Sequence, residues 1–111
     1  MKIDQTRQGT VMVLKPNAAL VEEDLAQFQQ AADEQLSAGN VRLVFDFAEM
    51  PFIASEGLEA MLDLSERAAR LGGGIRIASP CEITRDILVA TRLATRIEVF
   101  GEIAAARKSF L

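Results

Sequence analysis

The sequence contains no histidine, which removes the commonest general base and the commonest metal ligand of proteins. Its one cysteine, Cys81, allows no internal disulfide. A single cysteine without histidine also argues against a zinc site, and the carboxylates lack the spacing of a calcium-binding loop. We therefore expect a chain that needs neither a metal ion nor a cofactor.

Long apolar runs are also missing. No uninterrupted run approaches the roughly 20 residues that span a bilayer. The first residues, Met1 to Gln5, lack the apolar core of a signal peptide. The sequence thus predicts a soluble, cytoplasmic protein that does not insert directly into a membrane.

Positive charge is neither abundant nor clustered in the sequence. The formal net charge is −4, and the twelve Lys and Arg residues are scattered, with only short pairs such as Arg107-Lys108. Phosphate backbones require clustered cations, so nucleic acid is not the expected partner.

The 111 residues suit one domain, which we expect to extend over residues 1–111. Half of the residues are apolar and a quarter are charged, so the chain can bury a core. Neither an internal repeat nor a linker interrupts the apolar segments.

The apolar pattern predicts an opening hairpin followed by three strand–helix units. This order implies parallel strands joined by helical crossovers. The predicted fold is an α/β domain with a mixed sheet of four to five strands, an N-terminal hairpin and about four helices. The expected elements are a strand from Ile3, a turn at Gln8-Gly9, a strand 11–14, a helix 22–38, a strand 41–47, a helix 56–71, a strand 75–78, a helix from Pro80, a strand 97–100 and a helix after Gly101.

Apolar periodicity also predicts which side chains are buried. The continuous apolar run Leu43-Val44-Phe45 indicates a strand that is covered on both faces. On the helices, the expected buried residues are Val21, Leu25, Phe28, Ala32 and Leu36, then Leu58, Met61, Leu62, Ala69 and Leu71, then Ile83, Ile87 and Ala90, and finally Ile103, Ala106 and Phe110.

The junction Phe52-Ile53-Ala54-Ser55-Glu56-Gly57-Leu58 joins a buried strand to a helix. In open α/β sheets, sites form outside the carboxyl ends of the strands. Ser55 or Ala54 would be the N-cap, Glu56 would favour the helix dipole, and Gly57 would allow close approach of another backbone or a partner. The local chemistry taken alone favours the simpler interpretation, in which Ser55 caps the helix, Glu56 favours the dipole and nothing binds.

The segment from Val41 to Phe47, together with Met50 to Leu58, resembles the STAS family, which includes domains of sulphate transporters and bacterial anti-sigma factor antagonists. The family pattern is an apolar strand ending in Asp, a short link, an apolar pair, and Asp-Ser-Ser-Gly-Leu opening a helix. The resemblance implies a partner kinase, which is also the anti-sigma factor. This kinase phosphorylates the second Ser and thereby breaks its complex with the antagonist.

This sequence has a degenerate form of that phosphorylation motif. Ala54 replaces the Asp, Ser55 matches the first Ser, and Glu56 replaces the phosphoacceptor, while Gly57 and Leu58 match. Glutamate has no hydroxyl to phosphorylate and carries a permanent charge where a phosphate would carry about −1.5 to −2. The chain is then a fixed phosphate-like form, a binder of a partner that accepts an acid, or a protein modified at Ser55. We favour the second.

The resemblance implies a non-catalytic regulatory domain that docks on a protein through Ala54, Ser55, Glu56, Gly57 and Glu59. The expected partner is an anti-sigma factor of the serine-kinase type. The alternative is an accessory subunit that binds the ATPase of a bacterial lipid ABC transporter. An enzyme is the least favoured class.

Other polar residues have mainly structural interpretations. Asp46 is expected to bind backbone amides of the following loop, and Cys81 lacks a histidine partner for nucleophilic chemistry. The glycines 72–74 end a helix. Glu59, Asp63 and Glu66 form either a solvated helix face or the rim of a partner site.

Overall fold

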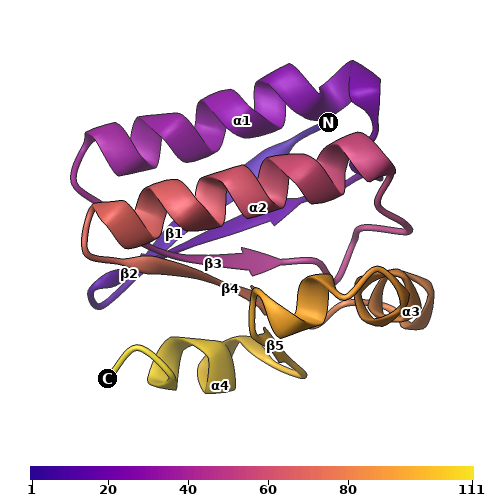
Figure 1. Ribbon diagram of the computed structural model, residues 1–111. Helices are drawn as coiled ribbons and strands as arrows, with labels where there is room; N and C mark the ends of the chain where they lie inside the picture. Colours follow the sequence, from indigo (N-terminus) through magenta and orange to yellow (C-terminus); the bar gives the residue numbers. More distant parts are fainter.

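The computed structural model describes residues 1–111, which form five strands, four α-helices and one short 3₁₀ helix. Figure 1 shows their arrangement along the chain. The elements are β1 (Ile3–Gln8), β2 (Val11–Pro16), α1 (Glu22–Ser37), β3 (Arg42–Asp46), α2 (Ser55–Arg70), β4 (Gly74–Ala78), α3 (Glu82–Ala90), η1 (Leu93–Thr95), β5 (Val99–Phe100) and α4 (Ile103–Lys108).

The five strands form one mixed sheet in the order β1-β2-β3-β4-β5. β1 and β2 pair antiparallel, and each later strand lies parallel to its neighbour. The predicted α/β fold with an N-terminal hairpin is therefore confirmed. The hairpin turn lies at Gly9-Thr10 and not at Gln8-Gly9, because Gln8 still pairs with Val11 and Gly9 has a positive φ of 66°.

β3 lies at the centre of the sheet, between β2 and β4. Leu43 and Phe45 join the larger core cluster, while Val44 joins a smaller cluster on the other face. All three side chains are fully buried, as the continuous apolar run predicted.

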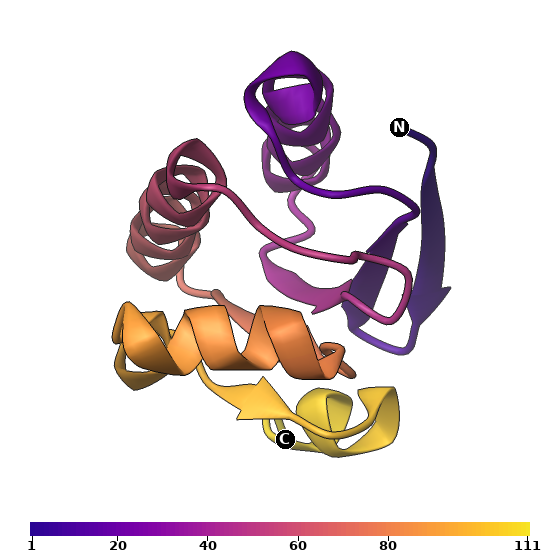
Figure 2. The same cartoon turned by 90° about the vertical axis from the view of Figure 1, so that its right-hand side faces the viewer.

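The helices cover the two faces of the sheet unequally. α1 and α2 lie side by side over one face, and the short α4 lies on the other (Figures 1 and 2). The larger cluster lies under α1 and α2, while the smaller one joins Val11, Val13 and Val44 to Ala106 of α4. The ring of Phe110, after α4, stacks under the guanidinium of Arg76 at 4.1 Å.

The prediction for α1 is correct to within one residue at its end. Phe28, Ala32 and Leu36 are buried, whereas Val21 and Leu25 are only partly buried. Gly39 follows the helix with a positive φ of 90°, as a C-terminal stop requires.

The prediction for α2 was wrong about part of its buried face. Ala69 and Leu71 are exposed, and Leu58 and Leu62 are only half-buried. Leu71 lies beyond the last turn, and Ala69 is rotated away from Ala68, which is buried. The buried stripe consists of Gly57, Ala60, Met61, Leu64 and Ala68.

The prediction for α3 also needs correction. The helix begins at Glu82 and not at Pro80, and Ile83 and Ala90 are exposed. Thr84 and Leu88 form the buried side of the helix. Of the stripe that the sequence predicted, only Ile87 is partly buried against the core. Ile97 is buried, but it precedes β5 and does not belong to it.

Candidate functional site

Three loops meet at the carboxyl edge of the sheet. They follow β2, β3 and β4, and they lead into α1, α2 and α3. Because these three strands are parallel, their carboxyl ends lie at the same edge, which faces the viewer in Figure 2. The sequence-predicted junction is therefore part of a larger surface built by all three loops.

The loop before α2 is fixed to the segment before α1. The Leu20 N–H donates to the carbonyl of Phe52 at 3.2 Å, and the Ala54 N–H donates to the carbonyl of Leu20 at 3.0 Å. Leu20 and Ile53 form an isolated parallel bridge, and both side chains are buried. The first residue of α2 is thus held in place by backbone pairing on one side and by apolar packing beneath.

Asp46 has the structural role that the sequence indicated. Its side chain is 4% exposed, and its Oδ1 accepts a hydrogen bond from the Ala48 N–H at 3.0 Å. This bond orients the first residues of the loop after β3. Asp46 therefore shapes the junction without reaching its outer surface.

The start of α3 supports the same loop. The Thr84 hydroxyl donates to the Met50 carbonyl at 3.1 Å, and the Cys81 thiol lies 3.3 Å from the same oxygen. The side chain of Thr84 lowers the pKa of the Cys81 thiol from its ordinary value of 9.0, with help from the Thr84 backbone N–H and against the effect of burial. The sequence contains no histidine to act as a base beside this thiol.

The N-cap of α2 is Ala54, so a helix cap at Ser55 is not what the structure shows. Ala54 has extended backbone angles, and no side chain makes a capping hydrogen bond. Ser55 and Glu56 lie in the first turn, and both are exposed. Neither side chain makes a hydrogen bond or an ion pair, so a hydroxyl and a carboxylate are free at this helix end.

Gly57 points the other way, into the core. A Cβ atom on it would lie 2.8 Å from Cγ of Leu20 and 2.9 Å from Cγ1 of Ile53. The close approach that glycine permits is therefore made by residues of the chain itself. Of the five sequence-predicted site residues, Ser55, Glu56 and Glu59 are exposed, Ala54 is partly buried and Gly57 is buried.

The helical layer around this turn is acidic. α1 and α2 carry nine of the sixteen acidic residues of the chain and only two of its twelve basic residues. Arg67 pairs with Asp33 at 2.6 Å and with Asp63 at 3.6 Å. Glu56 and Glu59 have no such partner, so they add uncompensated negative charge at the start of α2.

Sequence reasoning missed a groove beside α2. A concavity of about 270 Å³ separates α2 from the residues that follow α3. Its lining residues are Leu58, Leu62, Thr91, Arg92, Leu93, Thr95 and Arg96. No sequence signal could have pointed to it, because its lining joins two residues of α2 to residues 91–96, which lie about thirty positions later in the chain.

No group of three or more Cys, Asp or Glu side chains lies close enough together to hold a metal ion. None of its helices combines the length and the apolar character needed to cross a bilayer.

The family model of the STAS domain matches residues 2–106, which is nearly the whole chain. None of the curated proteins matches the chain in sequence. Solved structures show the same fold at low identity. A candidate anti-sigma factor antagonist from Thermotoga maritima superposes with a TM-score of 0.91 at 22% identity, covering 97% of this chain and 93% of the other.

Two further structures extend this comparison. An anti-sigma factor antagonist from Mycobacterium paratuberculosis gives a TM-score of 0.89 at 16% identity, over 98% of this chain and 92% of the other. The murine anion transporter Slc26a9 gives 0.76 at 17% identity, over 91% of this chain but only 18% of the transporter. The fold therefore occurs both as a small protein and as one part of a transporter.

Proposed function

Because the chain belongs to the STAS domain family, we propose that it is a non-catalytic regulatory domain that binds a protein partner through residues 54–57 and α2. The expected partner is an anti-sigma factor or a related serine kinase in the cytoplasm. In this proposal the chain does not bind a nucleic acid and does not insert into a membrane.

One observation carries the proposal. Ser55, Glu56 and Glu59 are exposed and unpaired on a turn whose backbone is fixed by Leu20 and Ile53. A fixed turn loses little conformational entropy on binding, so its free polar groups are available to a partner at low cost. Ala54 and Gly57 shape this turn from within.

Glu56 stands where the resemblance to STAS antagonists implies a phosphoacceptor serine. A carboxylate cannot be phosphorylated, so we propose that this turn works without the reversible serine switch. The partner surface facing Glu56 would then contain a lysine or arginine. Phosphorylation of Ser55 is disfavoured, since the charge of Glu56 would repel the added phosphate.

A second candidate is an accessory subunit that binds the ATPase of a lipid transporter. The likeness to one part of a murine anion transporter supports this candidate, because in that protein the same fold is attached to transport machinery. Both candidates use a protein partner. Genes for a sigma factor or serine kinase beside this gene would favour the first, and genes for a permease and an ATPase the second.

The test is affinity capture from the native cell with the wild-type chain and the Glu56→Ser variant. We expect the variant to bind its main partner at least tenfold more weakly. A hydrogen bond to a charged group contributes about 1.5–3 kcal/mol, and about 1.4 kcal/mol of binding free energy corresponds to a tenfold change in affinity. Glu102→Ser is the matched control, since Glu102 is exposed at the start of α4 on the other side of the sheet. Equal capture by all three proteins would show that Glu56 does not determine binding.

Mass analysis of the protein purified from its native cell tests the missing switch separately. We expect no phosphate on Ser55. Stoichiometric phosphate at that residue would contradict the proposal that this turn is a constant acidic surface.

A further inference from the structure

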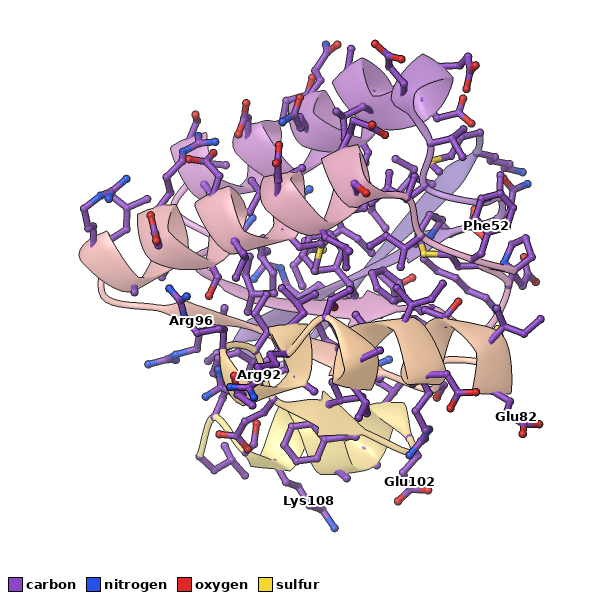
Figure 3. The ribbon with its side chains drawn as sticks, turned by 45° about the vertical axis from the view of Figure 1, so that its right-hand side comes forward. Phe52, Glu82, Arg92, Arg96, Glu102 and Lys108 are labelled. Atoms are coloured by element: carbon purple, nitrogen blue, oxygen red, sulfur yellow. The ribbon has the colours of Figure 1, made fainter.

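The concavity between α2 and residues 91–96 combines apolar and basic side chains. Leu93 of η1 belongs to the larger core cluster, and Leu58 and Leu62 of α2 pack against that cluster. Arg92 and Arg96 also line the concavity, and Figure 3 shows both near the carboxyl end of α3, below α2. No acidic side chain is part of the lining, so the lining is positively charged although the whole chain carries a net charge of −4.

The two guanidinium groups are available to an anion. Arg92 makes no ion pair, and Arg96 lies 3.7 Å from a carboxylate oxygen of Glu66. Both side chains of that pair are largely exposed, so solvent screens the pair and it contributes little to stability. The hydroxyls of Thr91 and Thr95, which also line the concavity, each donate to a backbone carbonyl. The arginines are therefore the side chains of the lining that have free hydrogen-bond donors.

Arg92 has a left-handed backbone conformation, which is unusual for a residue with a long side chain. Its φ is 64° and its ψ is 13°, in the region that glycine and asparagine enter most easily. The residues with positive φ after α1 and α2 are both glycines, Gly39 at 90° and Gly72 at 89°. The chain thus has an arginine after α3 where it has a glycine after two other helices. Residues held in such conformations cluster at ligand-binding sites, and this one lines the concavity.

The size of the concavity suits a small molecule. Its volume of about 270 Å³ equals that of about nine molecules of liquid water, which corresponds to a ligand of on the order of ten non-hydrogen atoms. A stable protein interface involves about 20–30 residues on each side, whereas seven residues line the concavity. The exposed Glu59, Asp63 and Glu66 of α2 also disfavour contact with an anionic bilayer surface.

We propose that this concavity binds a small organic anion, in which a carboxylate or phosphate group is attached to a short apolar chain. The anionic group pairs with Arg92 and Arg96, because planar guanidinium groups match the oxygens of carboxylates and phosphates. The apolar chain lies on Leu58, Leu62 and Leu93. This site is distinct from the docking turn at residues 54–57, so it does not depend on the proposed function.

The test is an NMR titration of the purified, ¹⁵N-labelled chain with hexanoate and with hexyl phosphate. We expect dissociation constants in the millimolar range or below, with the largest shifts at the backbone amides of residues 58–62 and 91–96. Hexanol lacks the charge and acetate lacks the apolar chain, so each should bind at least roughly tenfold more weakly than hexanoate.

Substitutions at Arg92 separate binding from folding. Arg92→Gln and Arg92→Gly should each weaken the binding of hexanoate roughly tenfold, since each removes a charged hydrogen-bond donor. In Arg92→Gly the urea midpoint of unfolding should stay unchanged or rise, because glycine adopts this backbone conformation without strain. Arg85→Gln is the matched control and should change neither quantity, because Arg85 is exposed on α3 and does not line the concavity.

Three results would overturn the proposal. The first is that neither hexanoate nor hexyl phosphate shifts the amides of residues 58–62 and 91–96; loss of the captured partner with Arg92→Gln would then assign the arginines to the protein interface. The second is binding that Arg92→Gln and Arg96→Gln leave unchanged. The third is equal binding of acetate and hexanoate, which would show that the leucines take no part. None of these results alters the capture expected with Glu56→Ser, so failure here is separate from failure of the proposed function.

Discussion

A Cβ atom on Gly57 would lie 2.8 Å from Cγ of Leu20, a separation shorter than side chains tolerate. Gly57→Ala therefore has to push α2 away from the segment that fixes it. We expect a loss of about 1–3 kcal/mol in the free energy of unfolding, as overpacking of a core costs. Urea titration measures this loss.

Gly101→Ala is the control for that experiment, because a Cβ atom on Gly101 meets nothing within 4 Å and its φ is not positive. It should change the free energy of unfolding by less than about 0.5 kcal/mol. An equal effect at both positions would show that the contact between Gly57 and Leu20 is not the cause.

Arg67 joins α1 to α2 through Asp33 at 2.6 Å, and this hydrogen bond raises the pKa of its guanidinium above the ordinary value. Both side chains are more than a third exposed, so solvent screens the pair. Arg67→Met should lower the free energy of unfolding by about 0.2–1 kcal/mol, and by less in 1 M salt. Arg70→Met, in the same helix and without an ion pair, should have no measurable effect in either condition.

The lowered pKa of Cys81 predicts a pH dependence that Thr84 controls. In the folded chain the thiolate should form, and react with iodoacetamide, below the ordinary value of 9.0. Thr84→Val should move the midpoint of this reaction toward 9.0. An unchanged midpoint would show that the Thr84 hydroxyl does not stabilise the thiolate.

The same shift affects stability with a definite sign. A group whose folded pKa is lowered contributes stability that is present above its unfolded value and is lost as pH falls through the folded value. The free energy of unfolding of the wild type should therefore rise as the pH approaches 9.0 from below, relative to Cys81→Ser. Urea titrations of both proteins across that range provide the measurement.

The two sides of α3 should respond differently to substitution. Ile83→Ser should change the free energy of unfolding by less than about 0.5 kcal/mol, because this side chain is largely exposed. Leu88→Ala should cost about 2–5 kcal/mol, because Leu88 is fully buried. A large loss at Ile83 would show that its side chain belongs to the core.

Elements with a strong local pattern could be predicted from the sequence. The run Leu43-Val44-Phe45 has no polar residue to face solvent, so it had to be a strand covered on both sides. α1 has a single apolar stripe and a glycine after it, and these fix both its face and its end.

The sequence could not predict the faces of α3. Apolar residues occupy more than one side of this helix, at Ile83, Ile87, Leu88 and Val89, and periodicity cannot decide which of them meets the sheet. Packing against the rest of the chain buries the side of α3 that carries Leu88. The sequence also could not decide whether Ala54 or Ser55 is the N-cap of α2. The start of this helix is set by the backbone pairing of Ala54 with Leu20 and not by the hydroxyl of Ser55.

The order of the strands has a consequence for folding during synthesis. Each strand pairs with the one made just before it, so every new unit can add to a sheet that already exists. α4 is different, since it covers Val11, Val13 and Val44, which leave the ribosome long before it does. Until Ala106 is in place, one face of the growing sheet stays bare, and a nascent chain stalled before that residue would be a ready substrate for chaperones and proteases.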